Sequence, residues 1–392
     1  MAYTELQAKT SATKDKLSKT IVLVEFGGYD KLRTWQRQIQ EPKEGEVIVE
    51  VKACGLNFAE VSARQGLYQK LPQLPMVLGL ECSGTIAKLG PGVTEPKVGT
   101  RVVCLKDWGL WTEYATIPAR NCFPIPDEMT FEEAAAIPVN YITAYLMLFD
   151  FGNLRPGKSV LIHMAAGGVG FAAAQLCKTV PKVTTFGTAS RHKHEAIMEN
   201  GITHPIDYRT KDYKEEILKI SPKGIDIVLD PLNGYDTTKG YQLLKPMGRI
   251  IVFGGANFVI GEHRSLWNLF KNWWNVPTYN GMKMMVDNKA VCGFHLGMLT
   301  DNYELIMEAM NALIEMYNEG KIKPKIDSIF PFEKIGDAMK RIHDRQNVGK
   351  IILVPELPPE TAEPVTSEEE TKDEQTTDKE TEDEKAEEEK EN

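Results

Sequence analysis

The chain contains the stretch VLIHMAAGGVG at residues 160–170, and this stretch indicates its fold class. An apolar run gives way to small residues and glycines, and the Ala-rich helical pattern FAAAQL follows at 171–176. This order predicts a strand, a tight turn and a helix, the opening of a dinucleotide-binding unit. Gly167 lets the backbone approach a pyrophosphate, Gly170 lets the helix pack closely on the strand, and free helix-start amides point at the phosphates. Ala165 replaces the first glycine of the usual fingerprint, so the motif alone is only moderately specific.

A second predicted strand, at 183–189, indicates which dinucleotide is preferred, because Ser190, Arg191 and Lys193 follow it. NAD-preferring enzymes usually place an Asp or Glu there to accept hydrogen bonds from the ribose 2′-hydroxyl. A hydroxyl and two cations can instead donate to a 2′-phosphate, each charge-assisted bond contributing roughly 1.5–3 kcal/mol. The expected cofactor is therefore NADPH. The alternative is a solvated helix start that carries incidental charges.

Strand and helix patterns predict an α/β fold with two kinds of region. Short alternating runs between Gly- and Pro-rich turns predict a β-rich region from Thr20 to about Val139. Alternating strands and helices then predict βαβ units and a parallel sheet. Its strands are expected at 160–164, 183–187, 225–229 and 249–253. Later elements are a strand at 291–296, a helix at 303–318, a strand at 326–330, a helix at 332–343 and a strand at 350–354.

The last three elements are expected to return to the first region, because a β-rich domain interrupted by a cofactor domain requires the chain to come back. The predicted organisation is a disordered start at 1–18, a β-rich domain at 19–140, a cofactor domain at 141–319, the return at 320–355 and a disordered tail at 356–392.

Acidic residues are concentrated in that tail. Residues 356–392 hold 17 acidic and 4 basic residues, a net charge of −13, whereas the rest of the chain carries a net +4. Such a segment cannot bury enough apolar surface to offset its ordering entropy. Three roles are open for it: a solvating appendage, a weak calcium-binding surface, or a tether for basic partners. The nearly neutral body does not resemble a nucleic-acid-binding surface.

Cysteine usage predicts a cytoplasmic protein. Six cysteines occur without a C-x-x-C pair or a disulfide-like spacing, as expected in a reducing compartment. The N-terminus is polar through Lys19 and shows no apolar signal core. The longest apolar run, 159–177, contains His163 and three glycines, so it is interpreted as the strand–turn–helix and not as a membrane span.

Several motifs together resemble the zinc-free quinone oxidoreductase branch of the medium-chain dehydrogenase/reductase superfamily. They are ACGLNFAE at 53–60, GLECSG at 79–84, PVNYITAY at 138–145, 165–170 and 187–193. The resemblance covers about 20–355 and implies a GroES-like catalytic domain and a Rossmann cofactor domain. It also implies a homodimer and NADPH-dependent hydride transfer to a quinone or enone.

Further segments resemble a subfamily of vesicle-membrane proteins. They lie at 181–231, 241–248 and 290–297. This closer resemblance implies peripheral association with vesicle membranes. It leaves a second function open, in which a membrane-associated binding or scaffold protein holds NADPH with little turnover.

The resemblance also indicates that no catalytic zinc is held. Zinc-dependent relatives have Cys at the position of Asn57, Asp at Glu60 and His at Leu80. A catalytic zinc needs three converging ligands, which this set cannot supply.

Asn57 is the expected catalytic residue. In the resembled family it faces nicotinamide and substrate, and its amide can donate to a carbonyl oxygen as enolate character develops. The alternative is a turn Asn that bonds its own backbone. Quinone-reducing relatives commonly have Tyr at Ser62, so the shorter side chain here suggests slow quinone turnover, with Tyr68 as the remaining substrate-binding aromatic.

The remaining expected site residues are cofactor contacts implied by the resemblance; for Tyr208 a plain surface aromatic is an equal alternative. They are Thr143, Ala166, Gly167, Gly168, Val169, Tyr208, Phe253, Gly254, Gly255, Asn347 and Lys350.

Two histidines are interpreted as structural. His163 ends a buried strand and is expected to be a satisfied core residue, and His295 is expected in packing or a subunit contact. Glu60 and Glu81 are not expected to form a paired acid–base site.

The segment at 266–274, LWNLFKNWW, places aromatic side chains at helical spacing with Arg264 and Lys271 nearby. It is either an interfacial membrane helix or a packing helix, serving as a lid or a subunit contact.

Overall fold

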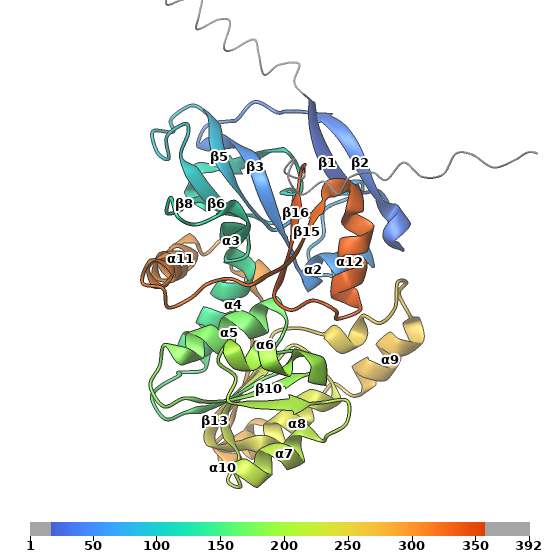
Figure 1. Ribbon diagram of the computed structural model, residues 1–392. Helices are drawn as coiled ribbons and strands as arrows, with labels where there is room; N and C mark the ends of the chain where they lie inside the picture. Colours follow the sequence, from blue (N-terminus) through green and yellow to red (C-terminus); the bar gives the residue numbers. More distant parts are fainter. Residues whose placement is uncertain (1–16, 357–392) are drawn as a thin grey trace, which may run out of the picture. The chain divides into compact units, whose positions relative to one another are not determined.

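The computed structural model describes residues 17–356 (Figure 1). Residues 1–16 and 357–392 lie outside the described residues, and with them nearly all of the predicted acidic tail, including any calcium binding by it. The first strand, β1 (Leu17–Leu23), begins two residues before the expected ordered boundary. Ser18 is buried there and its hydroxyl lies 2.8 Å from that of Thr112.

Six parallel strands form the predicted cofactor-domain sheet, in the order β11-β10-β9-β12-β13-β14. The strand order reverses between β9 and β12, and ligands of such sheets bind outside the carboxyl ends of the strands at that point. The α/β class with a Rossmann-type sheet is confirmed. The strands are β9 (Ser159–Ile162), β10 (Thr184–Ala189), β11 (His204–Asp207), β12 (Ile225–Asp230), β13 (Leu244–Val252) and β14 (Ala290–Gly293).

Helices connect these strands, and α5 is the one that shapes the site. Its residues 172–174 are all alanine, and they share a buried core with Val160 and Ile162 of β9. Small side chains let helix and strand approach closely, as the fingerprint predicts. The helices of this region are α5 (Gly168–Lys178), α6 (His194–Glu199), α7 (Tyr213–Ile220), α8 (Tyr235–Leu243), α9 (Leu266–Trp274), α10 (Gly281–Asp287) and α11 (Tyr303–Asn318).

A mostly antiparallel sheet forms the GroES-like region, in the order β15-β16-β3-β5-β6-β8, with β7 also paired to β3. A smaller sheet has the order β2-β1-β4. The strands are β2 (Leu32–Gln38), β3 (Glu46–Leu56), β4 (Met76–Val77), β5 (Glu81–Leu89), β6 (Arg101–Leu105), β7 (Tyr114–Pro118), β8 (Cys122–Pro124), β15 (Ile326–Pro331) and β16 (Lys350–Val354).

The chain returns to this sheet after α11, because β16 pairs antiparallel with the end of β3 and parallel with β15. Helix α12 (Ile335–His343) lies between β15 and β16 in sequence. Helices α2 (Phe58–Arg64) and α3 (Phe131–Ala135) cover the same region (Figure 1). The β16–β3 pairing brings residues 347–350 next to the start of α2, although almost 300 positions separate them in sequence.

A helical segment at 138–151 was not predicted. The short helix α4 (Thr143–Tyr145) is flanked by wide helical turns at Pro138–Ile142 and Leu146–Phe151. Such widened turns occur often at functional sites. The segment packs against α5 and holds Asn140 and Thr143, both buried.

Two strand predictions differ from the structure. β13 begins at Leu244 and not near 249, because the pairing with β12 shifts register around Ile225, which accommodates the turn-like residues Pro246 and Gly248. The strand predicted at 291–296 ends at Gly293, so His295 leaves the sheet. No helix within 17–356 combines the length and the apolar character needed to cross a bilayer.

Replacing Gly170 by Val should destabilise the fold. A Cβ there would lie 2.5 Å from the Met164 carbonyl oxygen and 2.7 Å from the Ala165 Cα. Because both are backbone atoms, the cost of overpacking should be about 1–3 kcal/mol, measured by chemical denaturation. Gly281→Ala is the control, since nothing lies within 4 Å of its Cβ position. Equal stability of the two variants would contradict the packing argument.

Candidate active site

A cavity of about 1450 Å³ opens at the carboxyl ends of the parallel strands. Its wall combines residues of the Rossmann-type sheet with residues of the GroES-like region. Of the sixteen site residues predicted from the sequence, fifteen line it: Asn57, Tyr68, Thr143, Ala166, Gly167, Gly168, Val169, Ser190, Lys193, Tyr208, Phe253, Gly254, Gly255, Asn347 and Lys350. Arg191 does not.

Glycines let the turn between β9 and α5, and the loop that follows β13, pack closely against neighbouring segments. The left-handed backbone conformation in this turn falls on Met164, whose φ is 51°. Ala165 therefore does not have to be a glycine. A Cβ on Gly168 would lie 2.4 Å from the Asn140 side-chain nitrogen, and one on Gly254 would lie 2.8 Å from the Pro231 carbonyl oxygen. At Gly167, the residue that caps α5, the nearest atom to a Cβ is 3.3 Å away. The start of α5 lines the cavity, and the first backbone N–H groups of a helix can hold a pyrophosphate.

Cations gather around Tyr208 at another part of the cavity wall. Burial opposes ionisation of the Tyr208 hydroxyl, yet hydrogen bonds from Arg209, Ser190 and Arg345 lower its pKa below the ordinary value. Both arginines line the cavity. This cluster of two guanidinium groups, a serine and a tyrosine can bind a phosphate. The sequence analysis missed both arginines, although each lies within two residues of a predicted contact.

The two basic residues that the sequence did single out are placed differently. Arg191 is exposed, and its guanidinium lies 3.3 Å from His194 Nδ1. Arg191 is not among the residues that line the cavity, and its predicted contact with the cofactor stays a prediction. Lys193 is buried and donates to the carbonyl oxygens of Arg345 (2.6 Å) and Asn347 (2.7 Å). These bonds tie the two regions of the molecule together.

Asn57 lies in a buried network. Its Nδ2 donates to Glu81 Oε1 at 2.8 Å, and its Oδ1 accepts from Lys350 Nζ at 2.5 Å. The same Lys350 ammonium donates to Glu81 Oε1 at 2.5 Å, and Val139 N donates to the other carboxylate oxygen at 2.7 Å. Lys350 is 4% exposed and Glu81 is fully buried. The sequence analysis assigned Lys350 to the cofactor and found no role for Glu81.

Glu60 also contacts Asn57. The Asn57 backbone N–H donates to Glu60 Oε2 at 2.9 Å, while Oε1 of that carboxyl has no partner among the described residues. Burial raises the pKa of Glu60 to about 8, against the lowering effect of the Lys350 ammonium. Glu60 and Glu81 therefore both contact Asn57; the Glu60 contact follows from the capping-box spacing at the start of α2, whereas the Glu81 contact depends on the tertiary structure.

The rings of Tyr68 and His295 belong to the cavity wall. The Tyr68 ring packs edge-on against Trp108 at 5.1 Å and lies 5.3 Å from the His295 ring. His295 thus belongs to the cavity wall and not merely to core packing; its Nδ1 is buried without a partner among the described residues. The Ser62 hydroxyl donates to the Phe58 carbonyl oxygen at 3.1 Å, so this short side chain is engaged locally.

His163 is only half satisfied. Its Nδ1 lies 3.2 Å from the Thr188 hydroxyl, while Nε2 is buried with no partner among residues 17–356. Burial lowers its pKa, which keeps the ring neutral.

Within residues 17–356, no group of three His, Cys, Asp or Glu side chains is placed to hold a metal ion.

Two family models match the chain: "Alcohol dehydrogenase GroES-like domain" at residues 43–127 and "Zinc-binding dehydrogenase" at residues 200–353. The chain is 54% identical over 341 residues to the human synaptic vesicle membrane protein VAT-1 homolog, covering 86% of this chain and 87% of that protein. It is 31% identical over 350 residues to human quinone oxidoreductase, covering 88% and 99%.

The crystal structure of Escherichia coli quinone oxidoreductase complexed with NADPH superimposes with a TM-score of 0.76, at 27% identity over 86% of this chain and all of that one. The chain therefore belongs to the medium-chain dehydrogenase/reductase superfamily, close to the VAT-1 homologs, and is an oxidoreductase of the quinone oxidoreductase type.

Proposed function

We propose that this protein is an NADPH-dependent, zinc-independent reductase of quinones or enones. The observation that carries the proposal is one cavity that joins a helix N-terminus, a cationic cluster and the buried Asn57 amide. The bound nicotinamide would supply a hydride. The α5 amides would hold the pyrophosphate, and Ser190, Tyr208, Arg209 and Arg345 would hold the 2′-phosphate.

The rest of the cavity would orient the two reacting groups. Thr143 and the loop at 253–255 would position the nicotinamide end. Asn57 would donate a hydrogen bond to the acceptor carbonyl, where negative charge develops in the transition state. The Tyr68 ring would pack against the acceptor and exclude water. Asn347 would contact the cofactor from its part of the cavity wall. The Lys193 ammonium donates to the Asn347 carbonyl oxygen and so holds this residue in place.

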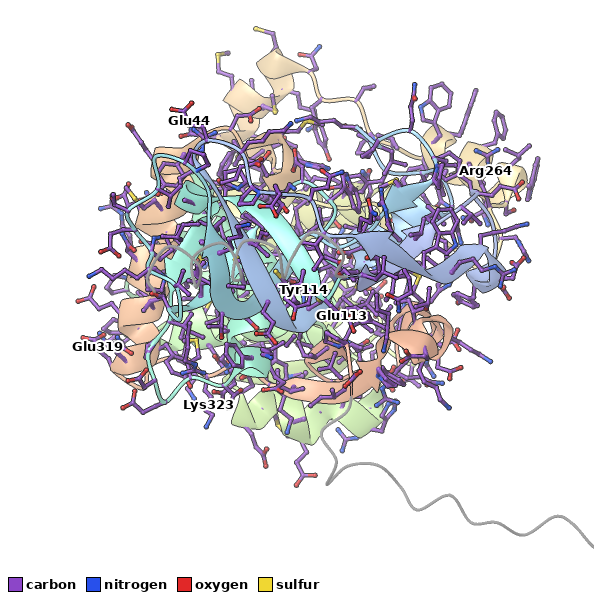
Figure 2. The ribbon with its side chains drawn as sticks, turned by 90° about the horizontal axis from the view of Figure 1, so that it is seen from above. Glu44, Glu113, Tyr114, Arg264, Glu319 and Lys323 are labelled. Atoms are coloured by element: carbon purple, nitrogen blue, oxygen red, sulfur yellow. The ribbon has the colours of Figure 1, made fainter. Side chains whose placement is uncertain are left out.

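A second candidate function is membrane-associated binding with little turnover, and helix α9 favours it. Its aromatic side chains are strongly exposed: Trp267 and Trp274 are each 74% exposed, and the centroid of each ring lies 6.1 Å from that of Phe270. Figure 2 shows Arg264 at the outer rim beside the ribbon of α9. Tryptophan favours the headgroup level of bilayers, and basic residues favour anionic lipids.

The opposite side of α9 is attached to the cavity. Asn268 and Asn272 donate to the Asn257 carbonyl oxygen at 3.0 and 2.8 Å, and Leu269 lines the cavity wall. Helix α9 would therefore act both as part of the cavity cover and as a peripheral contact to vesicle membranes from the cytoplasm. The homodimer implied by the resemblance is part of the same proposal.

Arg345→Ala should weaken NADPH binding about tenfold to 100-fold, since it removes a charge-assisted bond to the 2′-phosphate. NADH binding should change little. Arg191→Ala is the matched control and should bind both dinucleotides as the unchanged protein does. The measurement is a fluorescence titration with each dinucleotide. Equal affinity of the unchanged protein for NADPH and NADH would refute the cofactor assignment.

Asn57→Ala should lower the turnover number with a quinone or enone about 10²- to 10³-fold, the usual effect of losing an oxyanion donor. The assay follows NADPH oxidation at 340 nm with a panel of acceptors. NADPH affinity, measured separately, should stay within a few-fold. Tight NADPH binding without turnover on any acceptor would support the binding function in place of the reductase.

The variant Trp273→Ser/Trp274→Ser should no longer float with liposomes that contain phosphatidylserine, because it removes two exposed indole rings from α9. Tyr235→Ser, which changes an exposed aromatic on α8, is the control and should float normally. Unchanged flotation of the double variant would exclude α9 as the membrane contact.

A further inference from the structure

Lys350, the first residue of β16, is held with two of its three N–H bonds already used. It donates to Asn57 Oδ1 and to Glu81 Oε1, both at 2.5 Å. The ammonium is 4% exposed, and its partner carboxylate is fully buried. A buried ion pair of this kind is stable only when its remaining polar atoms are satisfied, and Val139 N serves this purpose for Glu81.

The Lys350 ammonium and the Glu81 carboxylate together set which way the Asn57 amide faces. An amide flip would turn its NH₂ group toward the Lys350 ammonium and its oxygen toward the Glu81 carboxylate, so that both contacts would be repulsive. The Nδ2 atom is thus fixed on one side, where one of its two N–H bonds donates to Glu81. The other N–H has no partner among the described residues, and Asn57 lines the cavity.

The ammonium also changes the strength of that N–H as a donor. An amide whose oxygen accepts a bond from a cation is polarised, and its N–H becomes a better donor. In addition, the Lys350 charge balances the Glu81 carboxylate, which lies 2.8 Å from Nδ2 and would otherwise repel an anion there. Both effects favour negative charge on a ligand oxygen bound to Asn57.

We propose that Lys350 is a positioning residue that orients and polarises the Asn57 amide as the donor to an acceptor oxygen that gains negative charge. The acceptors that fit are conjugated carbonyl compounds whose reduced forms are enolates or phenolates. This inference rests on the proposed reductase function, which supplies the reaction. It assigns Lys350 to the acceptor side of the site and not to the cofactor.

The test uses 4-nitrophenol as a probe, since its phenolate absorbs visible light and needs no turnover. The probe is titrated against pH with the full chain saturated with NADP⁺. The unchanged protein should bind the phenolate preferentially and so lower the pKa of the bound probe. Lys350→Met should weaken phenolate binding about tenfold or more, and Lys350→Arg should restore most of it.

Two further variants separate this role from a structural one. Lys350→Met/Glu81→Gln removes both buried charges, so it avoids an unpaired carboxylate, and it should still fail to favour the phenolate. Lys97→Met, at an exposed lysine, should behave as the unchanged protein. NADP⁺ affinity should be similar in all variants that fold.

The inference is overturned if the double variant binds the dinucleotide and also favours the phenolate as strongly as the unchanged protein. It is equally overturned if the unchanged protein prefers the neutral phenol. The protein could also favour the phenolate through Lys350 while none of the tested acceptors supports NADPH oxidation. That result would support the inference and contradict the reductase function.

Discussion

The pairing of β16 with β3 is the constraint on which the site depends. It places Lys350 against the end of the strand that leads into α2, and there the ammonium meets Glu81 and Asn57. The chain has by then passed through the whole Rossmann-type sheet. One antiparallel pairing therefore closes the GroES-like sheet and completes a polar network beside the cavity.

The same return segment connects the two regions at the cofactor end. Gly349 N donates to the Ala166 carbonyl oxygen at 2.9 Å, next to the start of α5, and Lys193 binds the carbonyls of Arg345 and Asn347. Backbone groups of residues 345–349 are thus held by the dinucleotide-binding unit itself. A cavity built across this contact has walls from both regions, and its shape follows from how they are joined.

Two histidines of the cavity wall each carry a ring nitrogen without a partner among the described residues. His163 Nε2 and His295 Nδ1 are buried and unpaired among residues 17–356, and both residues line the cavity. Leaving a buried polar atom unpaired typically costs about 1–3 kcal/mol. These two nitrogens fit a site whose polar surface is completed when it is filled.

The local sequence determined those strands and helices that depend on residues close to one another in the chain. The residue pattern at 160–176 specified β9, the turn and α5, and apolar periodicity gave α11 its bounds at 303–318, because propensity and spacing act within a few residues. Motif resemblance predicted Asn57 and, with a surface aromatic as an equal alternative, Tyr208 as site residues, and both line the cavity. Only the tertiary structure decided that Arg345 and Arg209, and not Arg191, join Tyr208, and that Lys350 bonds Asn57. Such contacts depend on strand pairing and side-chain direction across long sequence separations, which no local pattern records.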